Sequence, residues 1–240
     1  MEHDLQVVFE DEYLVVLDKP CELMVHQNEM ERHEPTCLGI LQKSYHQRFF
    51  TVHRLDRKTS GLLVFARSAE TAGALADLFR SQAVQKRYMA VVHGEPAQSS
   101  GSIDQPLQKR QGRKGATNAL TRYRVLSSGA LQVPVLSEED AVVSLMELEL
   151  VTGRQHQARR HARALGTPIV GDRRYGHRRF NHVVEEHLET RELFLRASSL
   201  QFTHPATGKP LTVTAVIPET WRPLLAQARI AVPAEYLPAL

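Results

Sequence analysis

The sequence predicts an α+β fold, a mainly antiparallel, mixed β-sheet flanked by helices and loops. Predicted strands outnumber predicted helices, and several are joined by short turns typical of hairpins. A chain of 240 residues suits one compact domain, and we expect residues 1–240 to form a single domain. Hydrophobic residues at 42% and charged residues at 24% are those of an ordinary globular protein. This composition excludes a disordered chain, a collagen-like repeat and a disulfide scaffold.

Strands are expected where β-branched and apolar residues cluster or alternate with polar ones. Leu5–Phe9 and Tyr13–Leu17 form the first pair, joined by a turn near Glu10–Glu12. A hairpin is expected around the turn Pro205–Pro210. The strands predicted after the first pair are 61–66, 87–92, 144–150, 194–203 and 211–217.

Helices are expected where a capping residue precedes apolar residues at helical spacing. Thr36 begins a helix that runs to about His46, and Ser68 begins a second one. The apolar face of this second helix is formed by Ala72, Leu75, Ala76 and Phe79.

Two further helices are expected in the second half of the chain. A basic helix runs from Gln155 to Leu165, where Gly166 marks its end, and Trp221 opens a short last helix. The stretch Gln98–Lys114, rich in Ser, Gly, Gln and basic residues, is expected to be a mobile loop.

The chain shows no sign of export or of a membrane span. Glu2 and Asp4 stand where a signal peptide would be basic, and no apolar run approaches the roughly 18 residues that a spanning helix needs. Cys21 and Cys37 are therefore expected to be free thiols. We expect a cytoplasmic protein, and a monomer because no large apolar surface stripe is visible.

The positive charge is unevenly distributed along the chain. Residues 1–52 hold four Lys/Arg and ten Asp/Glu, a net charge of −6, whereas residues 53–240 hold 26 and 17, a net charge of +9. Arginine outnumbers lysine by 23 to 7, and its planar fork of donors suits phosphate. The densest basic stretch is 154–179, and a second cluster lies at 109–114. This clustering favours a polyanion such as nucleic acid as the partner over a merely solvated face.

Familiar cofactor and metal motifs are absent. The chain has no G-x-G-x-x-G, Walker loop, G-x-S-x-G elbow, C-x-x-C or H-E-x-x-H. His156 and His161 would point about 140° apart around a helix, which does not place both on one metal. We therefore expect no metal and no cofactor.

One dense polar string runs from His53 to Gly61 and leads directly into the apolar run Leu62–Ala66. Asp56 lies within it, and its basic neighbours on both sides favour an ionised carboxylate. An ionised carboxylate at a pocket wall can be a nucleophile. On these residues alone, a surface salt-bridge network is the better interpretation.

A second string runs from Thr152 to His161. A predicted strand ends there, Gly153 permits a tight turn, and a helix bearing Arg and His begins. A helix amino terminus with nearby cations favours anions. RNA contact is therefore favoured over a basic helix face that only meets solvent.

Four ordered motifs resemble those of the RluA-type pseudouridine synthases, across roughly residues 5–217. They are Lys19-Pro20 with Val25-His26, His53-Arg54-Leu55-Asp56 with Thr59–Leu63, Lys86-Arg87-Tyr88-x-Ala90, and Gly153–His161, which resembles G-R-x-H-Q-x-R-x-H. Within this family, the finer features are most similar to the tRNA pseudouridine-65 synthase branch. Those features are Arg159-Arg160-His161, the neighbourhood of Asn181 and the turn His204–Gly208.

The resemblance implies an isomerase that breaks the N1–C1′ bond of a uridine, rotates the base and rejoins it through C5, without metal or cofactor. Asp56 matches the nucleophile of the family, Arg154 the arginine that pairs with it, and Tyr88 the tyrosine that stacks on the uracil. The favoured substrate is tRNA at uridine 65, with ribosomal RNA as the alternative.

The resemblance and the basic clusters also indicate candidate RNA contacts. Arg54 matches an arginine that fills the space left by an extruded base, and loop pairing is the alternative role for it and for His53. The complete candidate set is His53, Arg54, Arg57, His156, Gln157, Arg159, Arg160, His161, Lys109, Arg110, Arg113 and Lys114.

Three features depart from the family pattern. Glu22 stands where the family usually has Gly, so a positive φ there would strain it. Ala158 stands where the family prefers Leu or Ile. The chain also begins directly in the catalytic domain, without the S4-type RNA-binding domain of many relatives, so we expect the basic surfaces to hold the substrate.

One alternative belongs to another class, an RNA-binding or RNA-folding protein on the same scaffold. The presence of Asp56, Tyr88 and Arg154 together favours turnover over this reading. Glycoside hydrolysis is disfavoured, because it typically uses two carboxylates and only Asp56 lies in a motif.

Overall fold

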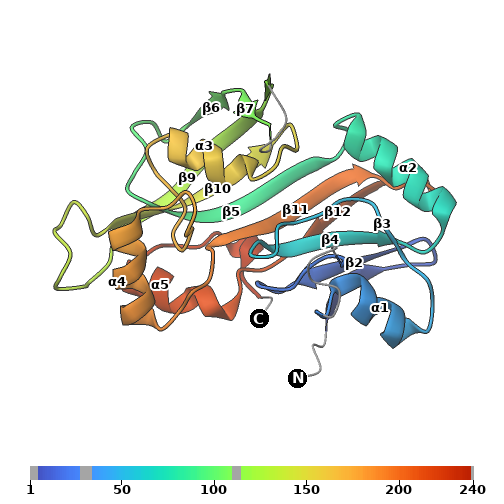
Figure 1. Cartoon of the computed structure of the whole chain (residues 1–240), viewed down its shortest axis with the longest axis horizontal. Helices are drawn as coiled ribbons and strands as arrows, with labels where there is room; N and C mark the ends of the chain where they lie inside the picture. The colour runs from blue at the N-terminus through green and yellow to red at the C-terminus, as the bar shows by residue number, and fades with distance from the viewer. Residues whose placement is uncertain (1–4, 28–33, 110–114, 239–240) are drawn as a thin grey trace. The chain divides into compact units, whose positions relative to one another are not determined.

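The computed structural model describes residues 5–27, 34–109 and 115–238. The chain divides into two compact units: unit 1 is Met1–Lys86 with Arg196–Ala215, and unit 2 is Arg87–Leu195 with Val216–Leu240. Figure 1 labels their helices and strands. Each unit has β-strands paired into a sheet and helices beside them, so the predicted α+β class is confirmed. In the described part of the chain, no helix is long and apolar enough to cross a membrane.

The strands of unit 1 pair in the order β1-β2-β4-β11, with β3 beside β4 and β12 beside β11. Neighbouring strands are antiparallel except β4 and β11, which run parallel and make the sheet mixed. The strands are β1 (Gln6–Glu10), β2 (Leu14–Lys19), β3 (Phe50–Thr51), β4 (Ser60–Ala66), β11 (Leu195–Thr203) and β12 (Pro210–Thr214). The first strand pair and the β11–β12 hairpin are therefore confirmed.

Two helices of unit 1 begin at the predicted capping residues. The Thr36 hydroxyl accepts a hydrogen bond from Gly39 N at the start of α1 (Cys37–Tyr45), and Ser68 accepts one from Thr71 N at the start of α2 (Ala69–Arg80). Each cap satisfies an amide that has no partner within its helix. Cys21 and Cys37, both among the described residues, form no disulfide bond.

The strands β5, β10, β9 and β6 of unit 2 pair in that order, and every neighbouring pair is antiparallel. Its strands are β5 (Gln85–His93), β6 (Ser100–Asp104), β9 (Leu120–Ala130) and β10 (Val142–Leu150), while β7 (Leu107–Gln108) and β8 (Ala116–Thr117) form a separate pair. Its helices are α3 (Gln157–Ala164), α4 (Arg178–Leu188), η1 (Glu219–Trp221), α5 (Arg222–Gln227) and η2 (Ala234–Tyr236). Trp221 is fully buried in the core of this unit, where its Nε1 donates to Glu192 at 3.1 Å.

The predicted loop at Gln98–Lys114 is wrong over its first part. β6 and β7 lie within it, and the side chains of Ile103 and Leu107 are buried. A short polar strand forms here because β9 supplies an antiparallel partner, which local composition does not reveal. Residues 110–114 of the predicted loop lie outside the described residues.

Candidate active site

Asp56 lies in unit 1, in the loop that joins β3 to β4. Its carbonyl accepts a hydrogen bond from Thr59 N at 3.0 Å, which closes a tight turn over the two intervening residues. Leu55 before the turn and Ser60 after it are buried, whereas Asp56 is partly exposed. The turn therefore holds Asp56 at the surface between two anchored residues.

Gly61 of the same motif is required by the strand pairing. It has a φ of +101°, and a Cβ added there would lie 2.2 Å from the carbonyl oxygen of Ala197 in β11. Only glycine allows β4 to approach β11 this closely in this conformation. The motif thus combines a partly exposed carboxylate with a backbone junction in the core.

His53 belongs to the framework of this loop. Its Nε2 accepts a hydrogen bond from Val64 N at 3.0 Å, and its ring stacks on Phe79 of α2 with centroids 4.4 Å apart. Because β3 ends at Thr51, the imidazole bonds an amide that β3 does not reach. Burial, and then the positive charge of Lys86, lower the pKa of His53 to about 3. These contacts favour loop pairing over RNA contact as the role of His53.

The lowered pKa of His53 predicts a pH-dependent stability. Between its ordinary value of 6.5 and about 3, the unfolded chain binds a proton that the folded chain excludes, so stability falls as the pH falls through this range. His53→Gln removes the titrating group. Urea titrations from about pH 8 to pH 5 should show a slope that is shallower in the variant, by up to about 1.4 kcal/mol per pH unit. Identical slopes in both proteins would contradict this assignment.

Lys19 is an anchor of the site that the sequence did not reveal. Its side chain is fully buried, and its Nζ donates to the carbonyl oxygens of Pro20, Leu23 and Arg57 at 2.7–2.8 Å. Burial lowers its pKa to about 8, although nearby groups that include Asp56 act in the opposite direction. Lys19 therefore joins the loop after β2 to the loop that carries Asp56. Its acceptors are backbone carbonyls, which leave no signal in sequence.

Replacing Lys19 with Met is expected to destabilise unit 1. Met retains the packing of the aliphatic stem but leaves three carbonyl oxygens without their donor, which costs about 1–3 kcal/mol of unfolding free energy. Urea unfolding at pH 7 measures this change. Lys43→Met, at an exposed position of α1, is the matched control and should change stability little. A Lys19→Met variant as stable as the control would show that these bonds contribute nothing.

The loop after β2 carries Glu22 in the left-handed region, with a φ of 65°. The strain expected at this position is therefore present. The Glu22 carboxylate lies 3.0 Å from Lys58 Nζ and 3.5 Å from Arg57 Nε, and the Glu22 backbone carbonyl oxygen accepts from Arg57 Nε at 3.0 Å. Both cations that follow Asp56 are thus paired with Glu22. Arg54 is exposed on the other side of Asp56 in sequence.

The other two predicted catalytic residues lie in unit 2. Tyr88 is a partly buried residue of β5, opposite Leu148 of β10. Arg154 lies in the turn before α3, where its side chain is exposed and its Nε donates to the carbonyl oxygen of Asn118 at 3.0 Å.

Gln157 positions the turn that bears Arg154. Its side-chain oxygen accepts from Arg154 N at 3.0 Å and from the Thr152 hydroxyl at 2.7 Å. Its side-chain nitrogen donates to the Leu120 carbonyl and to the Thr121 hydroxyl of β9. Gln157 is buried, and these contacts within unit 2 use both ends of its amide. It therefore fixes the backbone at Arg154.

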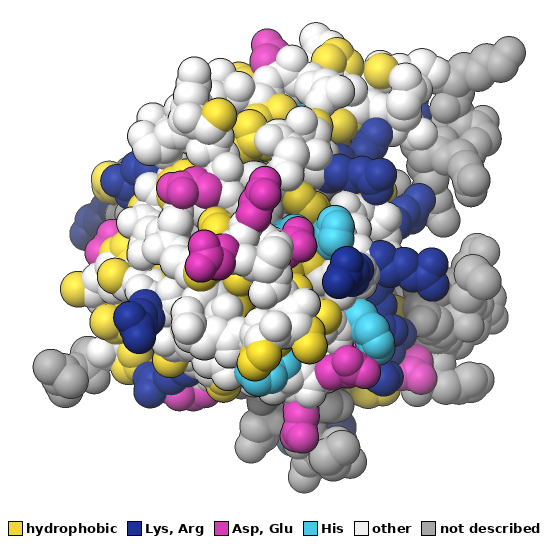
Figure 2. Space-filling model, turned by 90° about the vertical axis from the view of Figure 1, so that its left-hand side faces the viewer, with side chains coloured by type: hydrophobic (Ala, Val, Ile, Leu, Met, Phe, Trp, Pro, Cys, Tyr) yellow, Lys and Arg dark blue, Asp and Glu magenta, His cyan; other side chains and the backbone are white. Residues whose placement is uncertain are grey.

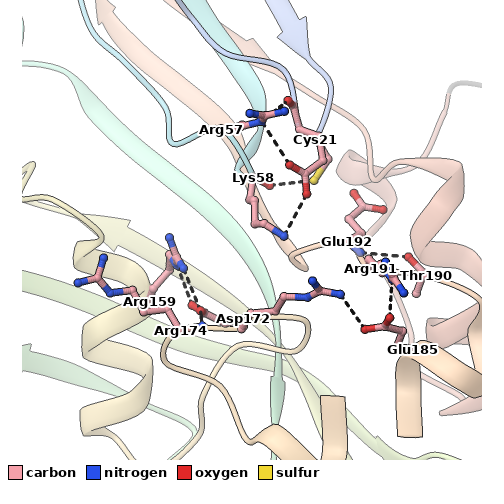
Figure 3. Close-up of polar contacts among 12 residues, drawn as sticks. Cys21, Arg57, Lys58, Arg159, Asp172, Arg174, Glu185, Thr190, Arg191 and Glu192 are labelled. Atoms are coloured by element: carbon pink, nitrogen blue, oxygen red, sulfur yellow. Dashed lines mark hydrogen bonds and ion pairs between the residues drawn. The ribbon is translucent and has the colours of Figure 1, made fainter. Parts of the chain in front are cut away.

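The basic helix predicted at Gln155–Leu165 is confirmed as α3, but much of its charge is buried. Arg159 makes a two-pronged ion pair with Asp172, at 2.7 and 2.9 Å (Figure 3). His161 is fully buried, and its ring nitrogens contact the Thr121 hydroxyl and the Gln105 carbonyl. This burial argues against direct phosphate contact by Arg159 and His161. The sequence could not show which face of so short a helix is covered.

His156 adopts a left-handed conformation at the start of α3, and its Nδ1 lies 3.0 Å from the Tyr175 hydroxyl. Arg160 is partly exposed and donates to the Gln108 carbonyl at 3.0 Å. Lys109 is exposed just after β7, while the predicted contacts Arg110, Arg113 and Lys114 lie outside the described residues. On the face drawn in Figure 2, one group of lysines and arginines lies toward the right-hand edge, and others are scattered at the left.

The structure thus places the predicted residues in two groups. Asp56, His53, Arg54 and Arg57 share one loop of unit 1. Tyr88, Arg154 and the α3 residues belong to unit 2, where Gln157 links α3 to the Arg154 turn. The pairing of Asp56 with Arg154 stays a prediction.

This α+β fold, with a carboxylate in a turn that enters a buried strand, is matched by a known family. The family model described as RNA pseudouridylate synthase matches residues 13–164. The chain belongs to this family, whose members are isomerases that act on RNA, and the expectation from the four motifs is confirmed.

Individual relatives are similar over nearly the whole chain. The tRNA pseudouridine synthase C of Vibrio cholerae is 36% identical over 235 residues, which cover 93% of this chain and 95% of the relative. The tRNA pseudouridine synthase C of Haemophilus influenzae is 36% identical over 233 residues, with coverage of 93% and 97%. The solved structure of Human RNA Pseudouridylate Synthase Domain Containing 4 has a TM-score of 0.76 at 26% identity, over 95% of this chain and 94% of that chain.

Proposed function

We propose that this protein converts uridine to pseudouridine in tRNA, at position 65, with Asp56 as the nucleophile. The observation that carries this proposal is the motif loop itself, in which a turn holds the Asp56 carboxylate between buried anchors. The names of the relatives in Vibrio cholerae and Haemophilus influenzae support tRNA as the substrate class. The similarity of Arg159–His161, Asn181 and the His204–Gly208 turn to the uridine-65 branch supports the position.

Three side chains have separate roles in the proposed reaction. The Asp56 carboxylate attacks the bound nucleotide, which lets the N1–C1′ bond break and the base rotate before it is rejoined through C5. Arg154 pairs with Asp56, since a guanidinium stabilises the ionised carboxylate. Tyr88 stacks on the uracil and assists removal of the C5 proton.

The target uridine must leave its stack before these groups can reach its glycosidic bond. Extrusion costs a few kcal/mol and leaves a space in the RNA helix. Arg54 is exposed beside Asp56 and is proposed to fill this space. Arg57, Arg160 and Lys109, together with Arg110, Arg113 and Lys114, are proposed to hold the phosphate backbone, which positions the RNA without reading its sequence.

We further propose a single catalytic domain that acts as a monomer in the cytoplasm. Among the described residues, the exposed large hydrophobic side chains are Val135 and Leu237, which supports a monomer.

The substrate class is tested by tritium release from RNA labelled at C5 of uracil, because rejoining through C5 expels that hydrogen. We expect release from an unmodified tRNA transcript and none from the same transcript carrying cytidine at position 65. Release from ribosomal RNA fragments alone would replace tRNA by ribosomal RNA as the substrate. Binding of RNA without release from any transcript would favour an RNA-folding protein instead.

A further inference from the structure

The loop after β2 holds an acidic side chain over the two cations that follow Asp56. Glu22 bridges Lys58 Nζ at 3.0 Å and Arg57 Nε at 3.5 Å. The side chains of Arg57, Lys58 and Glu22 are 43%, 29% and 51% exposed, so solvent and ligands reach this cluster. We call these three residues the Glu22 cluster.

The Glu22 carboxylate is not needed to join the two loops. Lys19 Nζ already donates to the Arg57 carbonyl at 2.8 Å, and Cys21 Sγ donates to the Lys58 carbonyl at 3.1 Å (Figure 3). Exposed ion pairs of the kind that Glu22 makes contribute little stability. Its left-handed backbone at φ 65° also carries strain that glycine would not have. Stability therefore does not account for a glutamate at this position.

In the Glu22 cluster, the carboxylate of Glu22 takes the place between two cations that a phosphate could take. A carboxylate offers two oxygens to a lysine and an arginine, as the two unesterified oxygens of a backbone phosphate would. Arg57 and Lys58 follow Asp56 directly in the chain, so a nucleotide whose glycosidic bond reaches Asp56 would carry its flanking phosphates toward these two side chains. The carboxylate and the phosphate then compete for the same two cations.

We propose that Glu22 is an internal counter-ion, which a backbone phosphate of the RNA displaces from Lys58 and Arg57. This inference rests on the proposed function and names a contact of that same site. Because the ion pairs of Glu22 must break first, the free energy gained when a phosphate binds Lys58 and Arg57 is smaller than it would be without Glu22. Glu22 thus lowers the affinity for any polyanion that places a phosphate on Lys58 and Arg57, the RNA substrate included.

The test is equilibrium binding of a fluorescently labelled tRNA transcript, followed by anisotropy. Glu22→Gln keeps the size of the side chain and removes its charge, so binding should tighten about 3- to 10-fold at about 0.1 M salt. Lys58→Met should weaken binding and lower the slope of log K against log salt by about 0.7–0.9, the value for one phosphate contact. In the variant that combines Glu22→Gln with Lys58→Met, the increase in tRNA affinity caused by Glu22→Gln should fall below about twofold.

Glu34→Gln is the matched control, because it removes one exposed acidic charge from the same unit. Glu22→Gly removes the charge and also the backbone strain at this positive φ. This second variant should tighten binding as Glu22→Gln does. Unchanged or weaker binding by both Glu22 variants would overturn the proposal, as would an equal gain in Glu34→Gln or an undiminished gain in the Lys58→Met background. Product formation is measured separately. A protein that binds tRNA without modifying it would refute the proposed function but would leave the counter-ion role of Glu22 standing.

Discussion

Asp56→Asn is expected to abolish pseudouridine formation while RNA binding persists. Asn retains the size of Asp and can keep the turn in which Asp56 O accepts from Thr59 N. It lacks the nucleophilic carboxylate, so the single-turnover rate should fall at least about 1,000-fold. Loss of one negative charge cannot weaken the attraction for phosphate, so affinity for tRNA should stay equal or rise.

Tritium release from C5-labelled tRNA gives the rate, and anisotropy gives the affinity. Asp77→Asn on the exposed face of α2 is the control, and it should match wild type in both measurements. An Asp56→Asn variant that retains more than about a tenth of the wild-type rate would show that this carboxylate is not the nucleophile.

Asp172→Asn is expected to destabilise unit 2 by about 3–5 kcal/mol, because it leaves Arg159 charged and buried without its counter-ion. The Asp172 carboxylate also accepts from the backbone amides of Arg174 and Tyr175. Burial alone would raise the pKa of Asp172, but Arg159 and these amides outweigh it and hold the pKa below its ordinary value.

The exposed ion pair of Arg173 with Glu185 provides the matched control in the same unit. Arg173→Met should cost less than about 1 kcal/mol in urea unfolding at pH 7, against the larger loss for Asp172→Asn. The contribution of Asp172 is complete above its unfolded pKa near 3.8 and is lost as the pH falls further. Equal losses in the two variants would show that burial adds nothing to the pair.

Much of the framework could be predicted from local sequence. Thr36 and Ser68 predict the starts of their helices because capping is a local interaction. The fully buried strand β4 was predicted because its residues 62–66 form a continuous apolar run. The short strand β6 was missed because its pairing with β9 is set by residues about twenty positions away. Local composition does not contain that information.

The candidate site shows the same division. The motif around Asp56 can be read from the sequence, and Glu22 was expected to be strained if its φ were positive. The anchoring role of Lys19 could not be predicted, because its acceptors are carbonyl oxygens as far as 38 positions away. The burial of Arg159 and His161 was missed for a similar reason, since their partners Asp172, Thr121 and Gln105 lie on other segments.

The most direct test of a tRNA uridine isomerase with Asp56 as its nucleophile is a product map. Unmodified tRNA is incubated with wild type or with Asp56→Asn, and pseudouridines are located by carbodiimide labelling and primer extension. We predict a stop at uridine 65 with wild type alone. A stop that persists with Asp56→Asn, or wild-type protein that binds the tRNA and leaves no stop, would contradict the assignment.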